Sequence, residues 1–471
     1  MSDKSRADRI EDQIRGIVAG IAVGERVPTV RELSKHFGAS PITIHKIFRK
    51  MSERGQIVTR PGSGTFVSAP PAAAAQRAAD TSWQTVALGP SPVDPTLASD
   101  LYLGPRAGVI ELASGYLDES LQPTALLRST AAAASRRPGG WGRAPLDGTP
   151  DLKAWFADQL GDPFRPSDVL IVSGGQAALS TVFRVLVPAG AAVVMESPTY
   201  FGALSCARNV GARLVPVPTD RDGVLPDYLD KALAASRSQV IYLQPAYSNP
   251  TGSTLSSERR HAVLQLARTH GAFIVEDDFA RELHLDGKPP RPLVIDAPER
   301  TIYLRSLTKA VAPAIRLAAI VTTGPVRARL QSARVMDDWF ASKFLQDVAV
   351  DVVSHPAWLR HLRLVRSRLR ERRDAVATAL ARHLPQARLN LIPDGGFNLW
   401  LQLPDGIDDL QLARDAERLG VHVHAGRGWF PAEASGSFVR ISFAAVDSPQ
   451  LRDGAAVLGE ALALQTANPR A

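Results

Sequence analysis

Six short apolar runs, separated by segments with helical patterns, occur in the middle of the chain. They lie at residues 169–172, 192–195, 240–243, 273–276, 302–304 and 317–321. Continuously apolar strands with helical crossovers are typical of a mostly parallel sheet covered by helices on both faces. The pattern therefore predicts an α/β fold for the larger part of the chain. In such sheets ligands bind at the carboxyl ends of the strands, so the residues directly after each run are candidates for a binding site.

Small or polar residues follow five of these runs. In chain order they are Gly175 and Gln176, Tyr200, Asn249, Asp277, and Lys309, which is flanked by Ser306 and Thr308 and followed by Arg316. A helix that starts at a glycine turn offers free N–H groups to a phosphate, and a carboxylate at a strand end is costly to bury without a cationic partner. Each residue alone has an ordinary structural explanation, such as a turn glycine or a core tyrosine. Together they predict one site that holds a lysine amine among phosphate-binding groups.

The first 68 residues have a different pattern and carry 12 Lys and Arg against 7 Asp and Glu. Apolar residues at helical spacing predict three helices. A capping-box pattern starts the second at Thr29, Gly38 ends it, and Ser40 followed by Pro41 opens the third. Two short β-type runs then flank residues 60–64, which predicts a hairpin. This order predicts a winged helix-turn-helix with its third helix in the DNA major groove. The alternative is a small helical domain with a basic, solvated face.

Nine residues form the predicted DNA-binding surface of this domain. Arg31, Lys46, Arg49 and Arg60 are expected to reach phosphates, Thr43 and His45 are candidates for base edges, and Ser40, Gly62 and Gly64 complete the surface. Phosphate contacts would set affinity and its salt dependence, whereas base contacts would set specificity. The expected partner is double-stranded operator DNA.

A proline- and alanine-rich stretch without an apolar face follows at residues 68–76. Such a composition is typical of a semi-rigid spacer. We therefore divide the chain into a DNA-binding domain at residues 1–68, a linker at 69–108 and a large domain at 109–471.

The large domain resembles fold-type I pyridoxal phosphate (PLP) enzymes of the class I aminotransferase group. The sequence Asn-Pro-Thr-Gly at 249–252, the lysine stretch at 306–316 and the segment 438–443 carry the resemblance, which spans roughly residues 109–464. It implies a smaller C-terminal α+β part beside the parallel sheet. It also implies a role for each matching residue: Lys309 forms the aldimine with PLP, Asp277 pairs with the pyridine nitrogen, Asn249 faces the ring hydroxyl, Tyr200 stacks on the ring, Gly175, Gln176, Ser306, Thr308 and Arg316 hold the phosphate, and Arg440 clamps a carboxylate of the substrate or effector.

Several positions depart from the usual pattern of that group, among them Ala318, where a glycine often follows the phosphate arginine and the next leucine. The group usually has a tyrosine two or three residues after the aspartate, but here those positions are Phe279 and Ala280, so one hydrogen bond to the ring hydroxyl is missing. Asn398 stands where many relatives have histidine. Trp141 stands where a tyrosine often reaches the phosphate in the partner subunit. These changes weaken the expectation of efficient transamination more than that of cofactor binding.

The N-terminal domain resembles the GntR family of bacterial regulators. The resemblance rests on residues 27–33, 38–44 and 60–67. A GntR-like domain joined to an aminotransferase-like domain is similar to the MocR subfamily of transcriptional regulators. This resemblance implies a PLP-bound homodimer that binds DNA and senses an amino compound or PLP itself. The alternatives are an active aminotransferase of the class I or 2-aminoadipate type with a fused DNA-binding arm, and an α/β scaffold that does not use PLP.

Composition and charge add three expectations. The charged N-terminus, the lack of a long apolar run and a single cysteine, Cys206, favour a cytoplasmic protein without a signal peptide or a disulfide. No His and Cys cluster has metal-ligand spacing, so no metal is expected. Seven arginines between residues 360 and 373 are expected to lie on the solvated face of a long helix.

Overall fold

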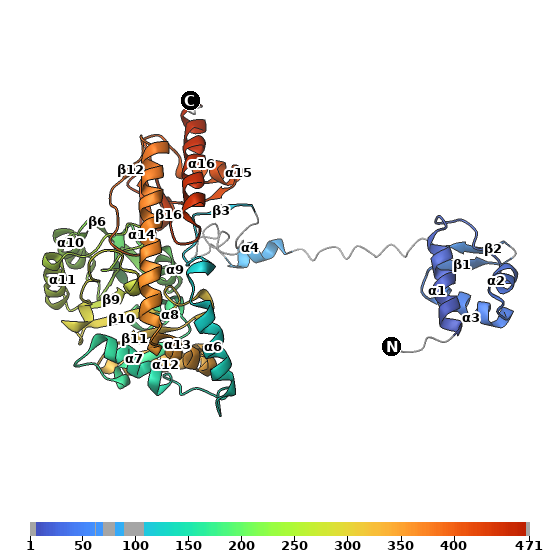
Figure 1. Ribbon diagram of the computed structural model, residues 1–471, viewed down its shortest axis with the longest axis horizontal. Coiled ribbons are helices and arrows are strands. Elements are labelled where there is room, and N and C mark those ends of the chain that lie inside the picture. Colours follow the sequence, from blue (N-terminus) through green and yellow to red (C-terminus); the bar gives the residue numbers. More distant parts are fainter. Residues whose placement is uncertain (1–5, 62, 69–80, 89–107, 468–471) are drawn as a thin grey trace. The chain divides into compact units, whose positions relative to one another are not determined.

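The structure is a computed structural model that describes residues 6–61, 63–68, 81–88 and 108–467. It divides into two compact units, Met1–Pro90 and Ser91–Ala471, and each is described here by itself (Figure 1). The predicted linker at residues 69–108 falls mostly outside the described residues, apart from one short helix.

The first unit has the order of elements expected for a winged helix-turn-helix. Its elements are α1 (Arg6–Ala19), α2 (Val30–Phe37), α3 (Pro41–Glu53), β1 (Ile57–Arg60), β2 (Gly64–Val67) and α4 (Ser82–Leu88). Ile14, Ile44 and Met51 are fully buried between the first helices, and β1 and β2 pair as an antiparallel hairpin. The amphipathic stripes read from the sequence thus form one small core.

The predicted helix ends of this unit are confirmed by their cap geometry. Thr29 and Glu32 form a complete capping box at the start of α2. Gly38 adopts a left-handed conformation with φ of 53° and ends that helix. The Ser40 hydroxyl accepts a hydrogen bond from the Thr43 N–H at the start of α3. These caps fix the turn between α2 and α3.

The second unit is built on an eight-stranded sheet with the strand order β4-β11-β10-β9-β8-β5-β6-β7. Its strands are β4 (Val169–Val172), β5 (Ala192–Ser197), β6 (Arg213–Asp220), β7 (Gly223–Val224), β8 (Val240–Leu243), β9 (Phe273–Asp277), β10 (Thr301–Ser306) and β11 (Ala318–Val321). The strands from β10 to β6 are parallel. In contrast, β11 is antiparallel to both its neighbours, and β7 is antiparallel to β6. The predicted mostly parallel sheet is confirmed, and each of the six predicted runs is one of its strands.

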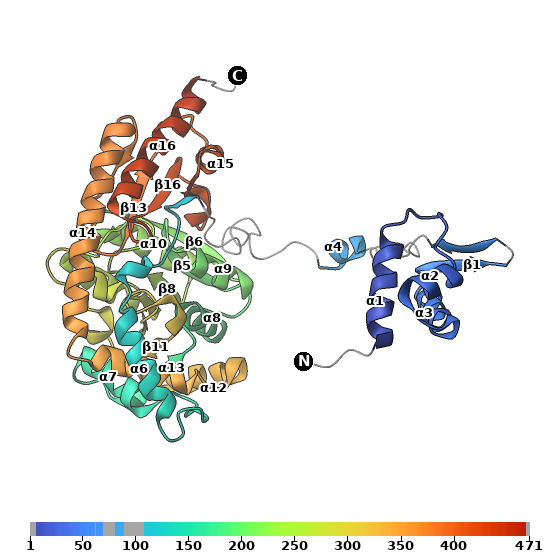
Figure 2. The same ribbon diagram turned by 45° about the vertical axis from the view of Figure 1, so that its right-hand side comes forward.

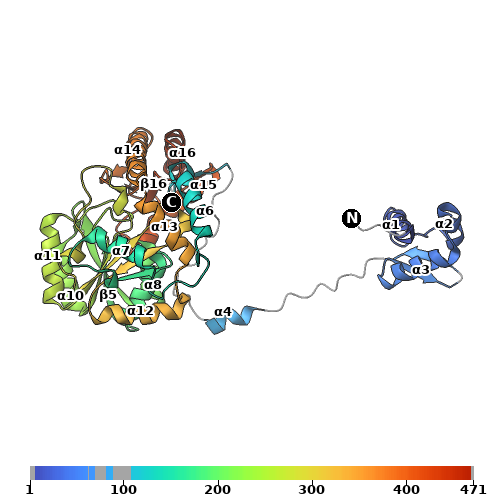
Figure 3. The same cartoon turned by 60° about the horizontal axis from the view of Figure 1, so that its bottom comes forward.

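Helices cover both faces of this sheet. They are α6 (Thr124–Arg136), α7 (Pro150–Leu160), α8 (Gly175–Leu186), α9 (Phe201–Asn209), α10 (Pro226–Ser236), α11 (Ser257–Thr269), α12 (Pro325–Asp338) and α13 (Lys343–Ser354). Side chains of α8, α9 and α12 share one hydrophobic cluster with one face of the sheet. On the other face, α6, α7 and α13 pack near β4 and β11, and α10 and α11 lie side by side near β5 and β8 (Figure 3). Because both faces are covered, ligands can approach only at the strand ends and loops.

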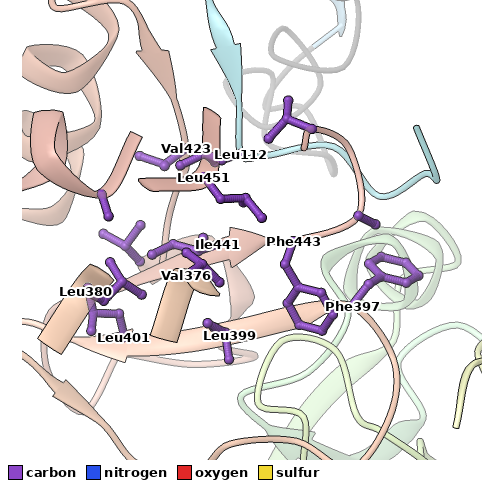
Figure 4. Close-up of a cluster of buried hydrophobic side chains, with 14 of the residues drawn as sticks. Leu112, Val376, Leu380, Phe397, Leu399, Leu401, Val423, Ile441, Phe443 and Leu451 are labelled. Carbon is purple, nitrogen blue, oxygen red and sulfur yellow. The ribbon is translucent and has the colours of Figure 1, made fainter. Parts of the chain in front are cut away.

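A smaller C-terminal part completes the second unit. It contains α14 (Trp358–His383), β12 (Arg388–Leu389), β13 (Asn398–Gln402), α15 (Asp409–Arg418), β14 (Val421–His422), β15 (His424–Ala425), β16 (Phe438–Ser442) and α16 (Ser448–Ala467). A four-stranded sheet has the order β12-β13-β16-β15, and β14 pairs with β3 (Ile110–Glu111). The helices α14 and α16 lie side by side against it (Figure 2). Their apolar side chains and those of β13 and β16 form a common core (Figure 4).

The arginine-rich helix corrects one expectation. Arg360 and Arg363 on α14 are exposed, as predicted for a solvated face. However, Arg372 and Arg373 are buried. Arg372 donates to the carbonyl of Ala444, and Arg373 donates to the Asp286 carboxylate and to the carbonyl of Pro393. These arginines therefore tie α14 to neighbouring loops instead of facing water. None of the described helices is long and apolar enough to cross a membrane.

Candidate functional site

A cavity of about 680 Å³ lies at the carboxyl ends of the strands of the large sheet, where it meets the C-terminal part. All ten residues that the sequence predicted for the cofactor and its ligand line this cavity: Gly175, Gln176, Tyr200, Asn249, Asp277, Ser306, Thr308, Lys309, Arg316 and Arg440. The folded chain thus brings together residues that are up to 265 positions apart, and both the strand-end reasoning and the family resemblance contributed to their prediction.

Lys309 follows β10 and points its amine into the cavity. Its Nζ donates a hydrogen bond of 2.9 Å to the carbonyl of Gly115 and lies 3.9 Å from the centre of the Tyr116 ring. Burial, together with repulsion from Arg440 and Arg316, lowers the pKa of Lys309 to about 7, against an opposing attraction to Asp277. A large fraction of this amine is therefore neutral, and nucleophilic, near pH 7.

Asp277 ends β9 and is held by two side chains that the sequence analysis missed. The Tyr242 hydroxyl donates to its Oδ2 at 2.7 Å and the Gln244 amide at 3.1 Å. Burial raises the pKa of Asp277 to about 6, although both hydrogen bonds act in the opposite direction. The carboxylate is thus buried and oriented, and it is suited to a cationic partner on a ligand.

Gln244 also orients the predicted asparagine. Its Oε1 accepts the backbone N–H of Asn249 at 3.0 Å, and its own N–H donates to Glu196. Asn249 Oδ1 is buried and has no hydrogen-bond partner among the described residues. Since Gln244 directly follows β8, the same strand-end reasoning should have included it. Tyr242, by contrast, sits inside an apolar run and gave no such signal.

The phosphate-binding candidates gather at the start of α8. Gly174, just before this helix, has φ of 101°, and a Cβ there would lie 2.9 Å from Arg316 Nη2. Position 174 therefore favours glycine. The close approach also shows that the Arg316 guanidinium lies next to the N-terminus of α8, where a phosphate could bind both. Ser306 accepts the Thr308 N–H at 3.2 Å, while the Thr308 hydroxyl is buried without a partner in the part of the chain that the structure describes. A phosphate would supply that missing acceptor.

Gln176 and Tyr200 contact each other across the cavity wall. The Tyr200 hydroxyl donates to Gln176 Oε1 at 3.1 Å, and the Gln176 amide donates to the Gly202 carbonyl and to Cys206. Because the Gln176 side chain is fully occupied by these contacts, only its backbone N–H remains suited to a phosphate. Cys206 is buried in α9, as expected for a structural thiol.

Arg440 lies in β16 at the opposite wall of the cavity and is only 2% exposed. It donates to Asn398 Oδ1 at 2.9 Å and to the carbonyl of Ala113, and it lies over the Trp429 ring at 4.8 Å. Its Nε has no partner within the described ranges. Burial lowers the pKa of Arg440 to about 10, which leaves it charged at neutral pH. A desolvated, incompletely paired guanidinium is suited to a carboxylate.

The departures from the usual pattern have structural counterparts. Phe279 packs edge-on against Phe397, with ring centres 6.0 Å apart, and brings no hydroxyl to the cavity. Asn398 is the side-chain partner of Arg440. Trp141 is 75% exposed and stacks on Phe344 at 5.0 Å.

The residues of the cavity fit PLP. The N-terminus of α8, Arg316 and the unpartnered Thr308 hydroxyl could bind its phosphate. Asp277 could pair with its protonated ring nitrogen. Asn249 could form a hydrogen bond with the ring hydroxyl, and the Lys309 amine could react with the aldehyde. The described residues contain no group of three or more His, Cys, Asp or Glu that could hold a metal ion.

The first unit presents its predicted DNA-binding side chains to solvent. Arg31, Lys46, Arg49 and Arg60 are exposed, as is His45. Arg60 lies over the Phe66 ring at 5.2 Å, which directs it along the hairpin. Gly64 starts β2, whereas Gly62 lies outside the described residues.

Two hydroxyls of this surface are already engaged. Ser40 caps α3, and its hydroxyl is 2.9 Å from that of Thr43. The sequence analysis missed Ile42, which is 70% exposed in the first turn of α3. An apolar side chain at this place can contact a thymine methyl group, so the exposed isoleucine joins His45 as a candidate for base edges.

Comparison with known proteins agrees with both units. Residues 107–458 match the model of the family described as aminotransferase class I and II. This chain belongs to that family. Residues 6–67 match the model of the gntR family of bacterial regulatory proteins. Aminotransferases of class I and II use PLP, which is also the cofactor that the residues of the cavity fit.

Individual relatives share the same two-part architecture or the larger unit alone. The chain is 27% identical over 454 residues to the uncharacterized HTH-type transcriptional regulator YdfD of Bacillus subtilis, covering 93% of this chain and 92% of that one. It is 28% identical to the probable rhizopine catabolism regulatory protein MocR of Rhizobium meliloti, covering 93% and 90%. The crystal structure of LysN, an alpha-aminoadipate aminotransferase from Thermus thermophilus complexed with N-(5'-phosphopyridoxyl)-L-leucine, has a TM-score of 0.73 at 29% identity, covering 77% and 94%.

Proposed function

We propose that this protein is a PLP-dependent, DNA-binding transcriptional regulator whose aminotransferase-like unit senses an amino compound. The observation that carries the proposal is the presence, in one chain, of a solvent-exposed cationic winged helix and of ten predicted PLP-type and ligand-binding residues around one cavity. Such a regulator acts in the cytoplasm, where bacterial DNA lies.

The residues divide the work of holding the cofactor. When bound, PLP supplies an aldehyde that reacts reversibly with amines and a ring that accepts electrons. The start of α8 and Arg316 bind its phosphate, and Asp277 stabilises the positive charge on its ring nitrogen. Lys309 would hold the aldehyde end, and once released from it the amine would carry a proton there, because burial lowers its pKa to about 7. Arg440 binds the carboxylate of the sensed compound.

The segment after β3 offers a route from the ligand to the rest of the chain. Its carbonyls at Ala113 and Gly115 are held by Arg440 and Lys309. A ligand carboxylate would compete with the Ala113 carbonyl for Arg440, and a ligand amine would compete with Lys309 for the Gly115 carbonyl. Binding therefore rearranges this segment, which in sequence leads back toward the DNA-binding unit. A ligand shifts DNA affinity only as far as it prefers one of the two arrangements, so sensing requires no turnover.

A second copy of the chain is the proposed partner of an exposed aromatic surface beside α12 and α13. There Trp141 is 75%, Met336 80% and Trp339 61% exposed. Phe344 stacks on Trp141, and Arg143 lies over the Trp339 ring. Large apolar side chains gathered in this way are typical of an interface between proteins. A homodimer would cover them and would present two winged helices to the two halves of an operator.

The second candidate is an active aminotransferase with a fused DNA-binding arm. The predicted cofactor residues that line the cavity and the similarity to the LysN structure favour it. Efficient turnover is less expected because Phe279 replaces the tyrosine that usually forms a hydrogen bond with the ring hydroxyl in class I aminotransferases.

A mobility shift assay with DNA upstream of the protein's own gene tests the proposal. We expect DNA binding that changes when an amino compound is added to the PLP-loaded protein. Lys309→Ala should abolish the response and the absorbance of covalently held PLP, whereas Lys288→Ala on an exposed loop should change neither. A Lys309→Ala protein that keeps both properties contradicts the proposal. Steady turnover of an amino acid with 2-oxoglutarate, without DNA binding, would favour the enzyme.

A further inference from the structure

One wall of the cavity is formed by polar residues that no cofactor role uses. Glu111 in β3 and His422 in β14 are direct partners in the register of these paired strands. The Nδ1 atom of His422 lies 3.0 Å from Glu111 Oε2. His424 follows in β15, with its ring centre 5.6 Å from that of His422. All three residues line the same cavity as Lys309 and Arg440.

This wall adjoins the carboxylate clamp. His424 and Arg440 are partners in the register of β15 and β16. Arg440 donates to the carbonyl of Ala113, whose N–H donates to Glu111 Oε1 at 2.9 Å. A compound whose carboxylate is bound by Arg440 therefore has Glu111, His422 and His424 within reach of its side chain.

The wall presents hydrogen-bond acceptors and one carboxylate, Glu111, which is paired with His422. Burial is the largest single influence on the pKa of Glu111 and raises it. The hydrogen bonds from His422 and the Ala113 N–H and the attraction to His422 and Arg440 together outweigh burial, so the pKa lies below its ordinary value. The carboxylate is thus ionised, and its two hydrogen bonds leave further lone pairs open. Burial and the positive charges nearby lower the pKa of His424 well below its usual range, so His424 is neutral and offers one more acceptor.

Apart from His422, which is already paired with Glu111, the described residues that line the cavity offer no unassigned cation for a second carboxylate. Four of its described lining residues are lysine or arginine: Arg305, Lys309, Arg316 and Arg440. Arg305 is 4% exposed and paired with buried Glu282, while the other three have the roles given above. A second carboxylate on the ligand would meet Glu111 and lose its hydration without gaining an unpaired counter-charge, because His422 is already paired with Glu111.

We propose that the sensed compound is an amino acid whose side chain ends in an amine or a guanidinium, and that this cationic end binds to Glu111 beside His422 and His424. This inference rests on the proposed sensing function and names the chemical class that the cavity selects. It separates the chain from the 2-aminoadipate type of aminotransferase, whose substrate ends in a carboxylate. The aromatic rings of Phe201 and Trp429 next to His424 complete a wall that suits a cation.

Three probes of nearly equal length test the inference: L-lysine, its uncharged counterpart L-norleucine, and L-2-aminoadipate. Their dissociation constants are measured on the PLP-loaded full chain by calorimetry and by the change in cofactor absorbance. We expect L-lysine to bind tightest and L-2-aminoadipate weakest. Glu111→Gln should weaken L-lysine roughly 10- to 100-fold, as expected for a lost charge-assisted contact, leave L-norleucine nearly unchanged and strengthen L-2-aminoadipate. The exposed carboxylate variant Glu119→Gln is the matched control and should change none of the three.

The outcomes separate the inference from the function on which it rests. Tighter binding of L-2-aminoadipate than of L-lysine overturns the inference, and so does an equal loss of L-lysine and L-norleucine in Glu111→Gln. If such ligands still change DNA binding, the sensing function stands and only the chemical class is wrong. If the protein holds PLP but no amino acid changes its absorbance or binds by calorimetry, both are wrong. The ranking in the unmodified protein is decisive even if Glu111→Gln fails to fold.

Discussion

The two units of this chain use cationic side chains in opposite ways. In the winged helix, Arg31, Lys46 and Arg49 extend into solvent from helices whose other faces form a small core. In the aminotransferase-like unit, Lys309 and Arg440 point into a cavity between packed elements and have lowered pKa values. The first arrangement keeps charge hydrated until it meets a phosphate backbone. The second removes charge from water in advance, so that a small ligand of the right charge is favoured.

This difference determines how selective each unit can be. Exposed charges act mainly through long-range attraction, which salt screens, so they give affinity with little chemical discrimination. Buried charges penalise every ligand that does not match them. The DNA-binding unit must therefore obtain its specificity from a few groups at base edges, such as His45 and Ile42, whereas the cavity obtains it from its charged walls.

The contrast between hydrated charges on the winged helix and desolvated charges in the cavity is tested most directly by the pKa of Lys309. In cofactor-free protein, reductive methylation with carbon-13 formaldehyde followed by NMR should show one lysine that titrates near pH 7, far below the ordinary value of 10.5. The sign follows from burial and from neighbouring cations, which favour the neutral amine, so Lys309 is neutral above that pH while the other lysines stay charged. The Lys309→Arg variant assigns the signal among nine lysines. A value near 10.5 would mean that the cavity is as wet as the winged-helix surface.

Arg440→Gln tests the carboxylate clamp. Loss of charge-assisted hydrogen bonds to a buried group should weaken binding of an α-amino acid roughly 100-fold, while PLP remains bound. Calorimetry with L-norleucine and with pentan-1-amine, which lacks the carboxylate, separates the clamp from general damage. Only L-norleucine should lose affinity, and Arg414→Gln on exposed α15 should affect neither compound. An equal loss for both would assign Arg440 a purely structural role.

Lys46→Ala tests whether an exposed cation of the winged helix contacts a DNA phosphate. Removing one phosphate contact should weaken DNA binding by up to about tenfold and reduce the slope of log affinity against log salt by about one, equally for different sequences. Fluorescence anisotropy across a salt series measures both quantities. Lys288→Ala in the other unit serves as the control. If the slope is unchanged, Lys46 does not reach a phosphate; if only one sequence is affected, it contacts a base.

The smallest expected effect concerns the cap that positions the DNA-reading helices. Thr29→Ala removes the capping box of α2 and should destabilise this helix by about 1 kcal/mol, which corresponds to roughly fivefold faster exchange of its amides. Hydrogen exchange of α2 in the full chain is the measurement. Ser52→Ala, at an exposed position of α3, should leave this exchange unchanged. No change in Thr29→Ala would mean that packing of Leu33 alone holds the helix.

Much of the fold and most residues of the candidate site were predictable because their signals are local. Strand-length apolar runs predicted the sheet, and residues directly after them predicted Gly175, Asn249, Asp277 and Lys309 as neighbours. The capping box and the Ser-Pro helix start predicted the ends of α2 and α3 in the same way. In each case a few consecutive residues determine the local backbone, and the sheet then places the strand ends together.

Tertiary structure alone decided what surrounds those residues. Glu111 and His422 are 311 positions apart and have no recognisable motif, so only the pairing of β3 with β14 shows that they form one wall. Tyr242 was read as part of an apolar strand because its hydroxyl finds Asp277 only across the sheet. The seven arginines at residues 360–373 of α14 have one local pattern, yet the elements packed against the helix bury two of them. Local sequence determines which backbone forms, whereas burial, charge pairing and pKa depend on distant groups that only the folded chain brings into contact.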